Sequence, residues 1–122
     1  MALTKSYRSS VIERIQRDPE YTAALYAEAV ACLIEGDKAT ALSIIRDLVH
    51  AHITFKSLSE ETGVGEKALH RMLGAHGNPT ADNLCRIMHT VEQDLSLSTE
   101  VTSKVRKRAR PSSKRKRSLA YA

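Results

Sequence analysis

Apolar residues recur three and four positions apart through most of the first 93 residues of the chain. This spacing places them on one face of a helix, because an α-helix completes a turn every 3.6 residues. Polar residues occupy the positions between them, so each helix should bury one face and expose the other. The pattern predicts an all-α fold with helices over 7–17, 19–35, 38–51, 55–62, 65–73 and 81–93.

Residues that start and stop helices stand at these boundaries. Asp18 precedes Pro19, and proline suits the first position of a helix because the amide that it lacks would have no partner there. Gly36 is expected to end that helix, and Asp37 to cap the next one. Thr80 follows a proline and should cap the last helix. The boundaries are therefore predicted by capping as well as by periodicity.

Residues 54–73 have the pattern of two short helices joined by a tight corner. Thr54 can cap the first helix with its hydroxyl, and Gly63 stands where the chain must adopt a left-handed conformation. Leu69 and Leu73 lie one turn apart in the second helix. This pattern is typical of a helix-turn-helix, in which the second helix lies in the major groove of DNA.

Residues 94–101 alternate between apolar and polar side chains, and two interpretations remain open. One is a short, half-buried strand, whose mate would come from another protomer or from a partner protein. The other is an irregular extended segment packed on the helical body. From Ser103 onward the chain is rich in Lys, Arg and Ser without apolar periodicity, and we expect it to be disordered.

The charges of the chain are segregated. Residues 1–103 contain ten Lys and Arg and fourteen Asp and Glu, which gives 10 − 14 = −4. Residues 104–122 contain nine Lys and Arg and no acid, which gives +9. A mildly acidic body is thus followed by a strongly basic tail, and this segregation indicates a polyanionic partner for the tail.

Composition restricts the class of protein. Aromatic residues make up only 4% of the chain and Trp is absent, so Ala, Leu, Ile and Val must build the core. No run approaches the roughly 18 apolar residues of a membrane span, and the first residues lack the apolar stretch of a secretion signal. We expect a cytoplasmic protein, associated with the nucleoid if it binds DNA, and no membrane partner.

The chain shows no arrangement of residues typical of an enzyme. Cys32 and Cys85 lie far apart within apolar helical patterns, and we expect both to be buried, reduced thiols. His50 and His52 are two positions apart and do not share a helical face, so no zinc-binding spacing is present. A Gly-rich phosphate loop and a nucleophile elbow are also absent from the sequence. We expect no metal, no cofactor and no catalytic residue.

Three blocks of the chain resemble a known family. They are ERIQRDPEYTAALYAEAV with EGDKATAL (13–30 and 35–42), LSEETGVGEKALHRML (58–73) and GNPTADNLCRIMHTV (77–91). Over 7–101 the chain is similar to the addiction-module antidote family, the antitoxins of the host-inhibition-of-growth type.

This resemblance implies a fold, a function and partners. The fold would be a λ-repressor-like helix-turn-helix domain of about five helices. The protein would dimerise, bind a palindromic double-stranded operator and neutralise a cognate ribonuclease toxin. The domain organisation that we expect is N-terminal helices over 1–36, a DNA-binding domain over 37–93, a short strand over 94–102 and a basic tail over 103–122.

The chain departs from this family at two places. Relatives have Ser, Thr or Asn at the cap of the recognition helix, where this chain has Gly65. Glycine is an acceptable cap, and Glu66 in the first turn suits the helix dipole. That carboxylate could accept from a cytosine amino group or point away from DNA. The second departure is the basic tail, which most relatives lack.

Candidate DNA contacts lie on the predicted recognition helix and at two neighbouring helix starts. Arg71 and Lys67 can donate to guanine edges or to phosphates, and the alternative is an ordinary solvated helix face. For Thr80 a simple capping role is the favoured alternative. The candidates are Lys56, Ser57, Gly65, Glu66, Lys67, His70, Arg71, Asn78 and Thr80.

The basic tail can follow phosphates without reading bases. If several of its residues bind DNA, affinity should fall with salt by a log–log slope of about 0.9 per neutralised phosphate. A solubilising tail and a nuclear-import signal are the alternatives. The residues are Lys104, Arg106, Lys107, Arg108, Arg110, Lys114, Arg115, Lys116 and Arg117.

The sequence therefore supports one leading hypothesis and two alternatives. The leading hypothesis is a dimeric DNA-binding antitoxin that represses its own operon and holds a basic toxin through its acidic body, at 19–35 and 94–101. The first alternative is a phage-type or bacterial transcriptional regulator without a toxin. The second is an architectural DNA-binding protein driven by the tail.

Overall fold

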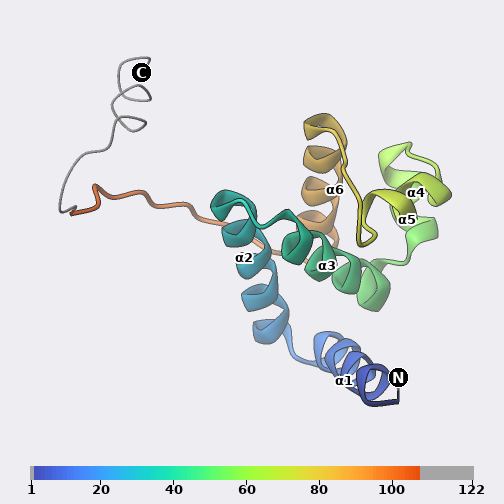
Figure 1. Ribbon diagram of the computed structural model, residues 1–122. Coiled ribbons are helices and arrows are strands. Elements are labelled where there is room, and N and C mark those ends of the chain that lie inside the picture. Colours follow the sequence, from blue (N-terminus) through green and yellow to red (C-terminus); the bar gives the residue numbers. More distant parts are fainter. Residues whose placement is uncertain (1, 108–122) are drawn as a thin grey trace.

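The computed structural model describes residues 2–107, and over this range the chain is helical, with no strand (Figure 1). The predicted all-α class is therefore confirmed for this part of the chain. Helix α1 begins five residues earlier than the pattern predicts. The elements are α1 (Ala2–Arg17), α2 (Pro19–Glu35), α3 (Lys38–Leu48), the π-helical turn η1 (Val49–Ile53), α4 (Phe55–Thr62), α5 (Glu66–Met72) and α6 (Ala81–Asp94).

Side-chain caps start four of these helices, α2, α3, α4 and α6, as the sequence predicts. The Asp18 carboxylate accepts from the Tyr21 amide at 3.1 Å. The Asp37 carboxylate accepts from the Thr40 amide at 3.2 Å. The pKa of Asp37 lies below its ordinary value, mainly because of a hydrogen bond with the Thr40 side chain and also because of this amide bond. Each cap satisfies an amide that has no partner within its helix, and this fixes the position at which the helix begins.

Helix α2 ends at Gly36, which has φ of 91°. The Gly36 amide donates to the Leu33 carbonyl, and the next amide donates to the Cys32 carbonyl, which is the Schellman arrangement. The apolar side chain of Ile34 does not face the core, and it is 74% exposed. Ile34 lies near the C-terminal end of α2, on the side that no other described element covers.

The structure replaces the last turn of the predicted 38–51 helix with the wider turn η1. The Thr54 amide donates to the Val49 carbonyl at 2.8 Å, five residues back. Helix α1 packs on this turn: Gln16 Nε2 donates to the Ala51 carbonyl at 3.1 Å, and His52 Nε2 donates to a carbonyl of α1 at 2.8 Å. A π turn has no local sequence signal as strong as a cap, and periodicity did not predict it.

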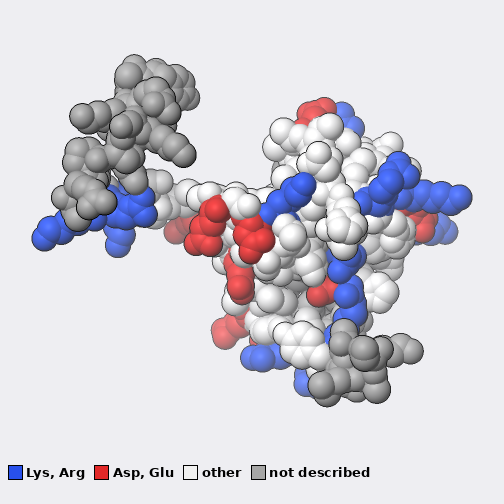
Figure 2. All heavy atoms as spheres, in the orientation of Figure 1, with Lys and Arg blue, Asp and Glu red and all other residues white. Residues whose placement is uncertain are grey.

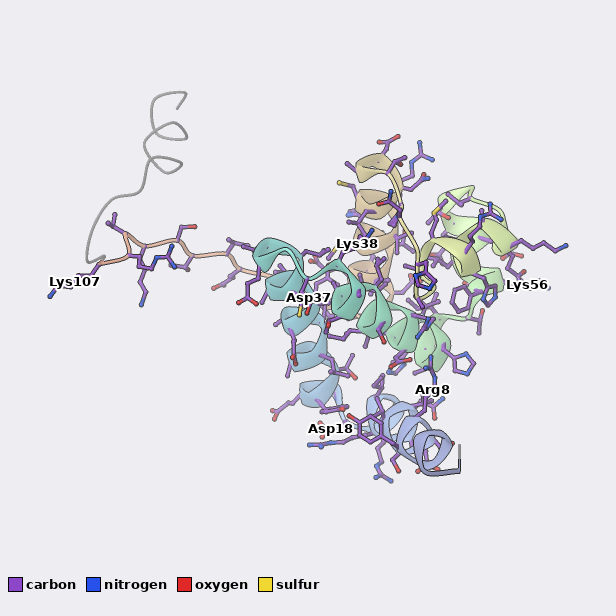
Figure 3. All side chains as sticks on the ribbon, viewed as in Figure 1. Arg8, Asp18, Asp37, Lys38, Lys56 and Lys107 are labelled. Carbon is purple, nitrogen blue, oxygen red and sulfur yellow. The ribbon has the colours of Figure 1, made fainter. Side chains whose placement is uncertain are left out.

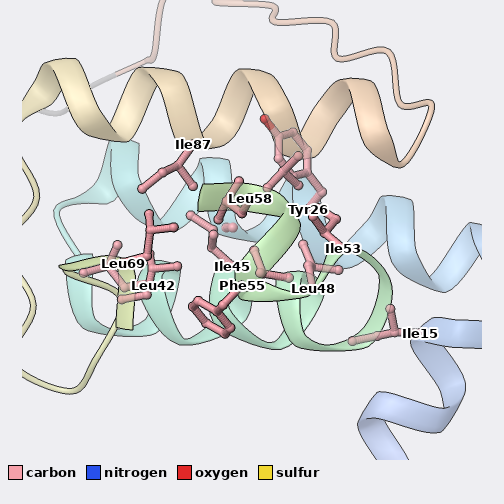
Figure 4. Packing of buried hydrophobic residues seen from close by; sticks show 14 residues of the cluster. Ile15, Tyr26, Leu42, Ile45, Leu48, Ile53, Phe55, Leu58, Leu69 and Ile87 are labelled. Atoms are coloured by element: carbon pink, nitrogen blue, oxygen red, sulfur yellow. The ribbon is translucent and has the colours of Figure 1, made fainter. Parts of the chain in front are cut away.

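One hydrophobic cluster joins all the helices (Figure 4). Tyr26 is its largest aromatic member, and its hydroxyl donates to the Met88 carbonyl at 3.4 Å. Burial is the main cause that raises the pKa of Tyr26, with additional contributions from the charge of Glu92 and from a hydrogen bond to it. Side chains that are fully buried include Ile15, Leu42, Ile45, Leu48, Val49, Leu58, Leu69, Leu73, Ile87 and Val91.

The strand expected at 94–101 is absent from the described residues. The alternative, an irregular segment packed on the body, holds only as far as Leu97, because the residues that follow are exposed. Helix α6 continues to Asp94 and ends with Ser96 at φ of 55°. The Ser96 and Leu97 amides donate to the Gln93 and Glu92 carbonyls, again a Schellman arrangement. The first half of the alternating pattern therefore belongs to a helix end, and Leu97 is half-buried against the core.

After Leu97 the chain leaves the body. Residues 98–107, which we call the arm, are extended and exposed throughout. The arm begins beside α2, where Ala23, Tyr26 and Ala27 face 97–100 across a shallow pocket of about 140 Å³. It then projects away from the helices (Figure 1). The disorder predicted for 108–122 lies outside the described residues.

The two cysteines differ in burial. Cys32 is 8% exposed on α2, whereas Cys85 is exposed on α6. The expectation of a buried Cys85 is therefore wrong, because α6 turns that position away from its core-facing residues Ile87 and Val91. Neither sulfur is bonded to another.

Candidate nucleic-acid interface

The corner, residues 54–73, forms as the sequence predicts. Thr54 caps α4 by accepting from the Ser57 amide at 3.2 Å. Its backbone has φ of 73° and ψ of 148°, a conformation that is strained for a β-branched residue and that the sequence did not signal. Gly63 ends α4 at φ of 79°, and its amide donates to the Ser59 carbonyl at 2.9 Å. The chain then changes direction into α5.

Two hydroxyl groups of α4 hold the turn in place. Ser59 Oγ donates to the Val64 carbonyl at 2.7 Å, and the Val64 amide donates to Thr62 Oγ1 at 3.2 Å. Both backbone groups of Val64 are thereby satisfied although it belongs to no helix. Short hydroxyl side chains are known to bind nearby backbone in this way, so Ser59 and Thr62 beside Gly63 are a local sequence signal of the turn that periodicity does not contain.

Helix α5 divides sharply into a buried and an exposed face. Leu69 and Leu73 are completely buried, and Val64 and Met72 are half-buried against the core. The five outward positions predicted from the sequence are all exposed. They are Gly65, Glu66, Lys67, His70 and Arg71.

His70 has a second role that the sequence did not reveal. Its ring stacks on Phe55 with 3.8 Å between the centroids and 19° between the planes. Phe55 is buried at the start of α4, so this stack joins the outer side of α5 to the N-terminus of α4. His70 remains exposed, and its orientation is set before any ligand arrives.

Contacts with α3 and with the following loop hold the end of α5 in place. Arg46 of α3 donates from Nη1 to the Leu73 carbonyl at 3.2 Å. In the following loop, a Cβ at Gly77 would lie 1.8 Å from the Met72 carbonyl oxygen. Glycine is therefore required there for the loop to close on the end of α5. These contacts connect α5 rigidly to the core.

The candidates around the neighbouring helix starts have partners within the protein. Asn78 Oδ1 accepts from Lys38 Nζ at 3.2 Å (Figure 3 shows Lys38), so a lysine absent from the predicted set lies beside a predicted contact. Thr80 accepts from the Asn83 amide at 3.1 Å, which confirms its capping role. Ser57 is half-buried, and its amide is engaged by the Thr54 cap rather than free for a phosphate. Lys56 is exposed.

Charge is distributed unevenly over the surface. Asp and Glu gather over α2, whereas the α4–α5 side carries extended Lys and Arg side chains with acidic ones among them (Figure 2). Near the other end of α4, Glu61 lies by Asp94 of α6, and their hydrogen bond is the main cause that raises the pKa of Glu61. This acidic pair joins two helices.

The basic tail begins on the side opposite the corner. Lys107 and Lys56 lie at opposite ends of the view in Figure 3. Lys104, Arg106 and Lys107 are exposed on the arm. The remaining tail candidates lie outside the described residues: Arg108, Arg110, Lys114, Arg115, Lys116 and Arg117.

Two features are absent from residues 2–107. No three His, Cys, Asp or Glu side chains in this part of the chain lie close enough together to hold a metal ion. None of its helices is long and apolar enough to cross a membrane.

Comparison of the chain with family models, with curated proteins and with solved structures found no match. The function of this protein is therefore inferred from the residues of its own chain.

Proposed function

We propose that this protein is a sequence-specific DNA-binding repressor and the antitoxin of a toxin–antitoxin pair. The observation that supports DNA binding best is the exposed side of α5, where Lys67 and Arg71 lie four residues apart and therefore on one face. Leu69 and Leu73 anchor the opposite face. Helix α5 has seven residues, and an α-helix with its side chains is about 10–12 Å in diameter, which suits a major groove about 12 Å wide.

The residue types on this face suit base recognition. A guanidinium such as that of Arg71 can donate two hydrogen bonds to one guanine, and Lys67 can reach a guanine edge or a phosphate. Lys56, at the start of α4, supplies a positive charge for the DNA backbone. His70 is held by its stack on Phe55, so less conformational entropy is lost when it makes a contact.

A helix this short contacts few base pairs, so a single copy would have little specificity. Two copies bound to half-sites about 34–36 Å apart would double the number of base contacts. The proposal therefore includes a homodimer on a palindromic operator. The role as an antitoxin rests on the family resemblance of 7–101 and on the acidic charge of the body, which complements a basic ribonuclease.

DNA selected from a random pool by the full chain provides the operator for the test. Lys67→Ala with Arg71→Ala should lower the ratio of specific to nonspecific affinity by about 10- to 100-fold, because each good base contact contributes about 1–3 kcal/mol. Fluorescence anisotropy measures both affinities. Arg14→Ala with Arg17→Ala is the control, since it removes the same charge from α1. An unchanged ratio in the α5 variant contradicts the proposal.

Truncation after Lys107, which leaves the arm in place, separates the role of the tail from that of α5. It should mainly reduce the salt dependence of binding and leave the specificity ratio intact. Loss of all binding on truncation, with no effect of the α5 variant, would instead favour the tail-driven architectural protein. For the antitoxin role, the product of the adjacent reading frame should stop growth alone and copurify with this chain. A non-toxic neighbour would favour a regulator without a toxin.

A further inference from the structure

We propose that the arm of one copy binds along the outer face of α2 in a second copy. The outer face is the exposed side of that helix, and the residues that matter on it are Ala24, Ala27, Ala31 and Ile34, with Glu28 and Glu35. The proposal deepens the dimer of the proposed function by naming its interface. It does not require that the protein bind DNA.

The outer face of α2 is apolar where a surface helix is ordinarily polar. Helical spacing places its alanines and Ile34 on one side, and Ile34 is 74% exposed. The acids Glu20, Glu28 and Glu35 lie on the same side, and Pro19–Glu35 contains no Lys or Arg. Among the described residues, nothing in the same chain covers this face beyond the edge where 97–100 begin the arm.

The arm has the complementary composition. Val101 is 71% exposed and Val105 is 98% exposed, so two β-branched apolar side chains project into water. They are four residues apart and therefore on the same side of an extended chain. Residues 101–107 also carry Lys104, Arg106 and Lys107, with no acid. The same alternation puts Lys107 on the side of the valines and Lys104 and Arg106 on the other side, so the valines match the apolar stripe and the flanking cations match the acids beside it.

Length and symmetry agree with this pairing. Seven extended residues span about 23 Å, and the 17 residues of α2 span about 25 Å. The arm leaves the body beside its own α2 and then projects away from it (Figure 1). A twofold axis close to α2 would therefore place each arm against the α2 of the other copy, in one isologous interface.

The first test is disulfide trapping between different chains, in a Cys32→Ala, Cys85→Ser background that circular dichroism shows to be folded. Chains with Val105→Cys are mixed with tagged chains carrying Ile34→Cys and oxidised. We expect a covalent heterodimer. The control replaces Ile34→Cys with Lys67→Cys on α5, which should give at least about tenfold less product. Equal yields, or no heterodimer, would overturn the proposal. So would a disulfide that closes within a single Ile34→Cys, Val105→Cys chain.

The second test is a charge exchange measured by sedimentation equilibrium without DNA. Glu28→Lys with Glu35→Lys should raise the dimer dissociation constant about tenfold, and so should Lys104→Glu with Arg106→Glu. Combining all four changes in one chain should restore dimerisation, since the opposite charges then face each other again. Glu13→Lys with Glu60→Lys is the control away from α2 and should have little effect.

The outcomes also distinguish this inference from its rivals. Arm variants that leave self-association unchanged would overturn it, even if they release a copurifying toxin, since the outer face would then serve that other protein. A monomeric wild-type chain would overturn it as well. Failure to find an operator would leave both measurements unaffected, because neither contains DNA.

Discussion

The corner and the arm differ in how the chain determines their structure. In the corner, the Thr54 cap, Gly63 and the hydroxyls of Ser59 and Thr62 fix the backbone through contacts between residues two to five apart. Within the described part of the chain, the arm makes no such hydrogen bond after Leu97, and its apolar residues are exposed. One region presents a preformed surface, and the other requires a second molecule to give it a defined environment.

This comparison explains the division of roles that we propose. A surface that reads bases must hold its donors in place before DNA arrives, because misplaced donors lose specificity. A segment that joins two copies gains its order on association, and it can therefore stay extended in the single chain. Three substitutions test this contrast.

The largest effect is expected where the loop closes on the corner. Gly77→Ala should destabilise the protein by about 3–5 kcal/mol, because the added methyl would overlap the Met72 carbonyl oxygen. Urea unfolding followed by circular dichroism measures the free energy of unfolding. Gly65→Ala is the matched control, since a Cβ there meets nothing within 4 Å, and it should cost less than about 1 kcal/mol. Equal costs would show that the loop is free to move away.

The next effect concerns Tyr26 on the inner side of α2. This side packs in the core, whereas the outer side of the same helix is exposed. Tyr26 is 4% exposed and its pKa is raised, so the folded state retains a proton that the unfolded chain loses near pH 10. The free energy of unfolding should therefore fall above about pH 10, by up to about 1.4 kcal/mol per pH unit from this group.

Tyr26→Phe should remove this part of the alkaline loss, while at pH 7 it costs only about 1 kcal/mol for the hydroxyl bond to Met88. Urea unfolding at pH 7, 10 and 11 measures the slope, and exposed Tyr7→Phe serves as the control. Parallel slopes in wild type and Tyr26→Phe would contradict a buried, protonated phenol.

The smallest effect is expected from removal of a single hydroxyl group, compared between the corner and the arm. Ser59→Ala removes the donor to the Val64 carbonyl and should cost about 1 kcal/mol of stability. Ser98→Ala on the exposed arm should change stability by less than about 0.5 kcal/mol. Thermal unfolding at low protein concentration measures both variants in the single chain. A similar result for the two would mean that the hydroxyl does not hold the turn.

Part of the candidate site could be predicted from the sequence, because the spacing of residues within one helix decides which side chains are exposed. Periodicity alone identified the exposed residues Lys67 and Arg71, because a helix that buries Leu69 must turn those positions outward. It could not reveal that His70 stacks on Phe55 or that Lys38 lies beside Asn78, since those pairs are 15 and 40 residues apart. The alternation after Asp94 predicted a strand, yet Ser96 and Leu97 complete the end of a helix.

The amino-acid sequence by itself determined the helices, their caps, the corner at Gly63 and the segregation of charge. Caps and turns depend on residues within one helical turn of each other, so their chemistry can be read directly along the chain. Only the tertiary structure decided the turn η1, the exposure of Ile34 and Cys85, and the departure of the arm beside α2. Those features depend on which helices pack together, and packing joins residues whose separation in sequence carries no local signal.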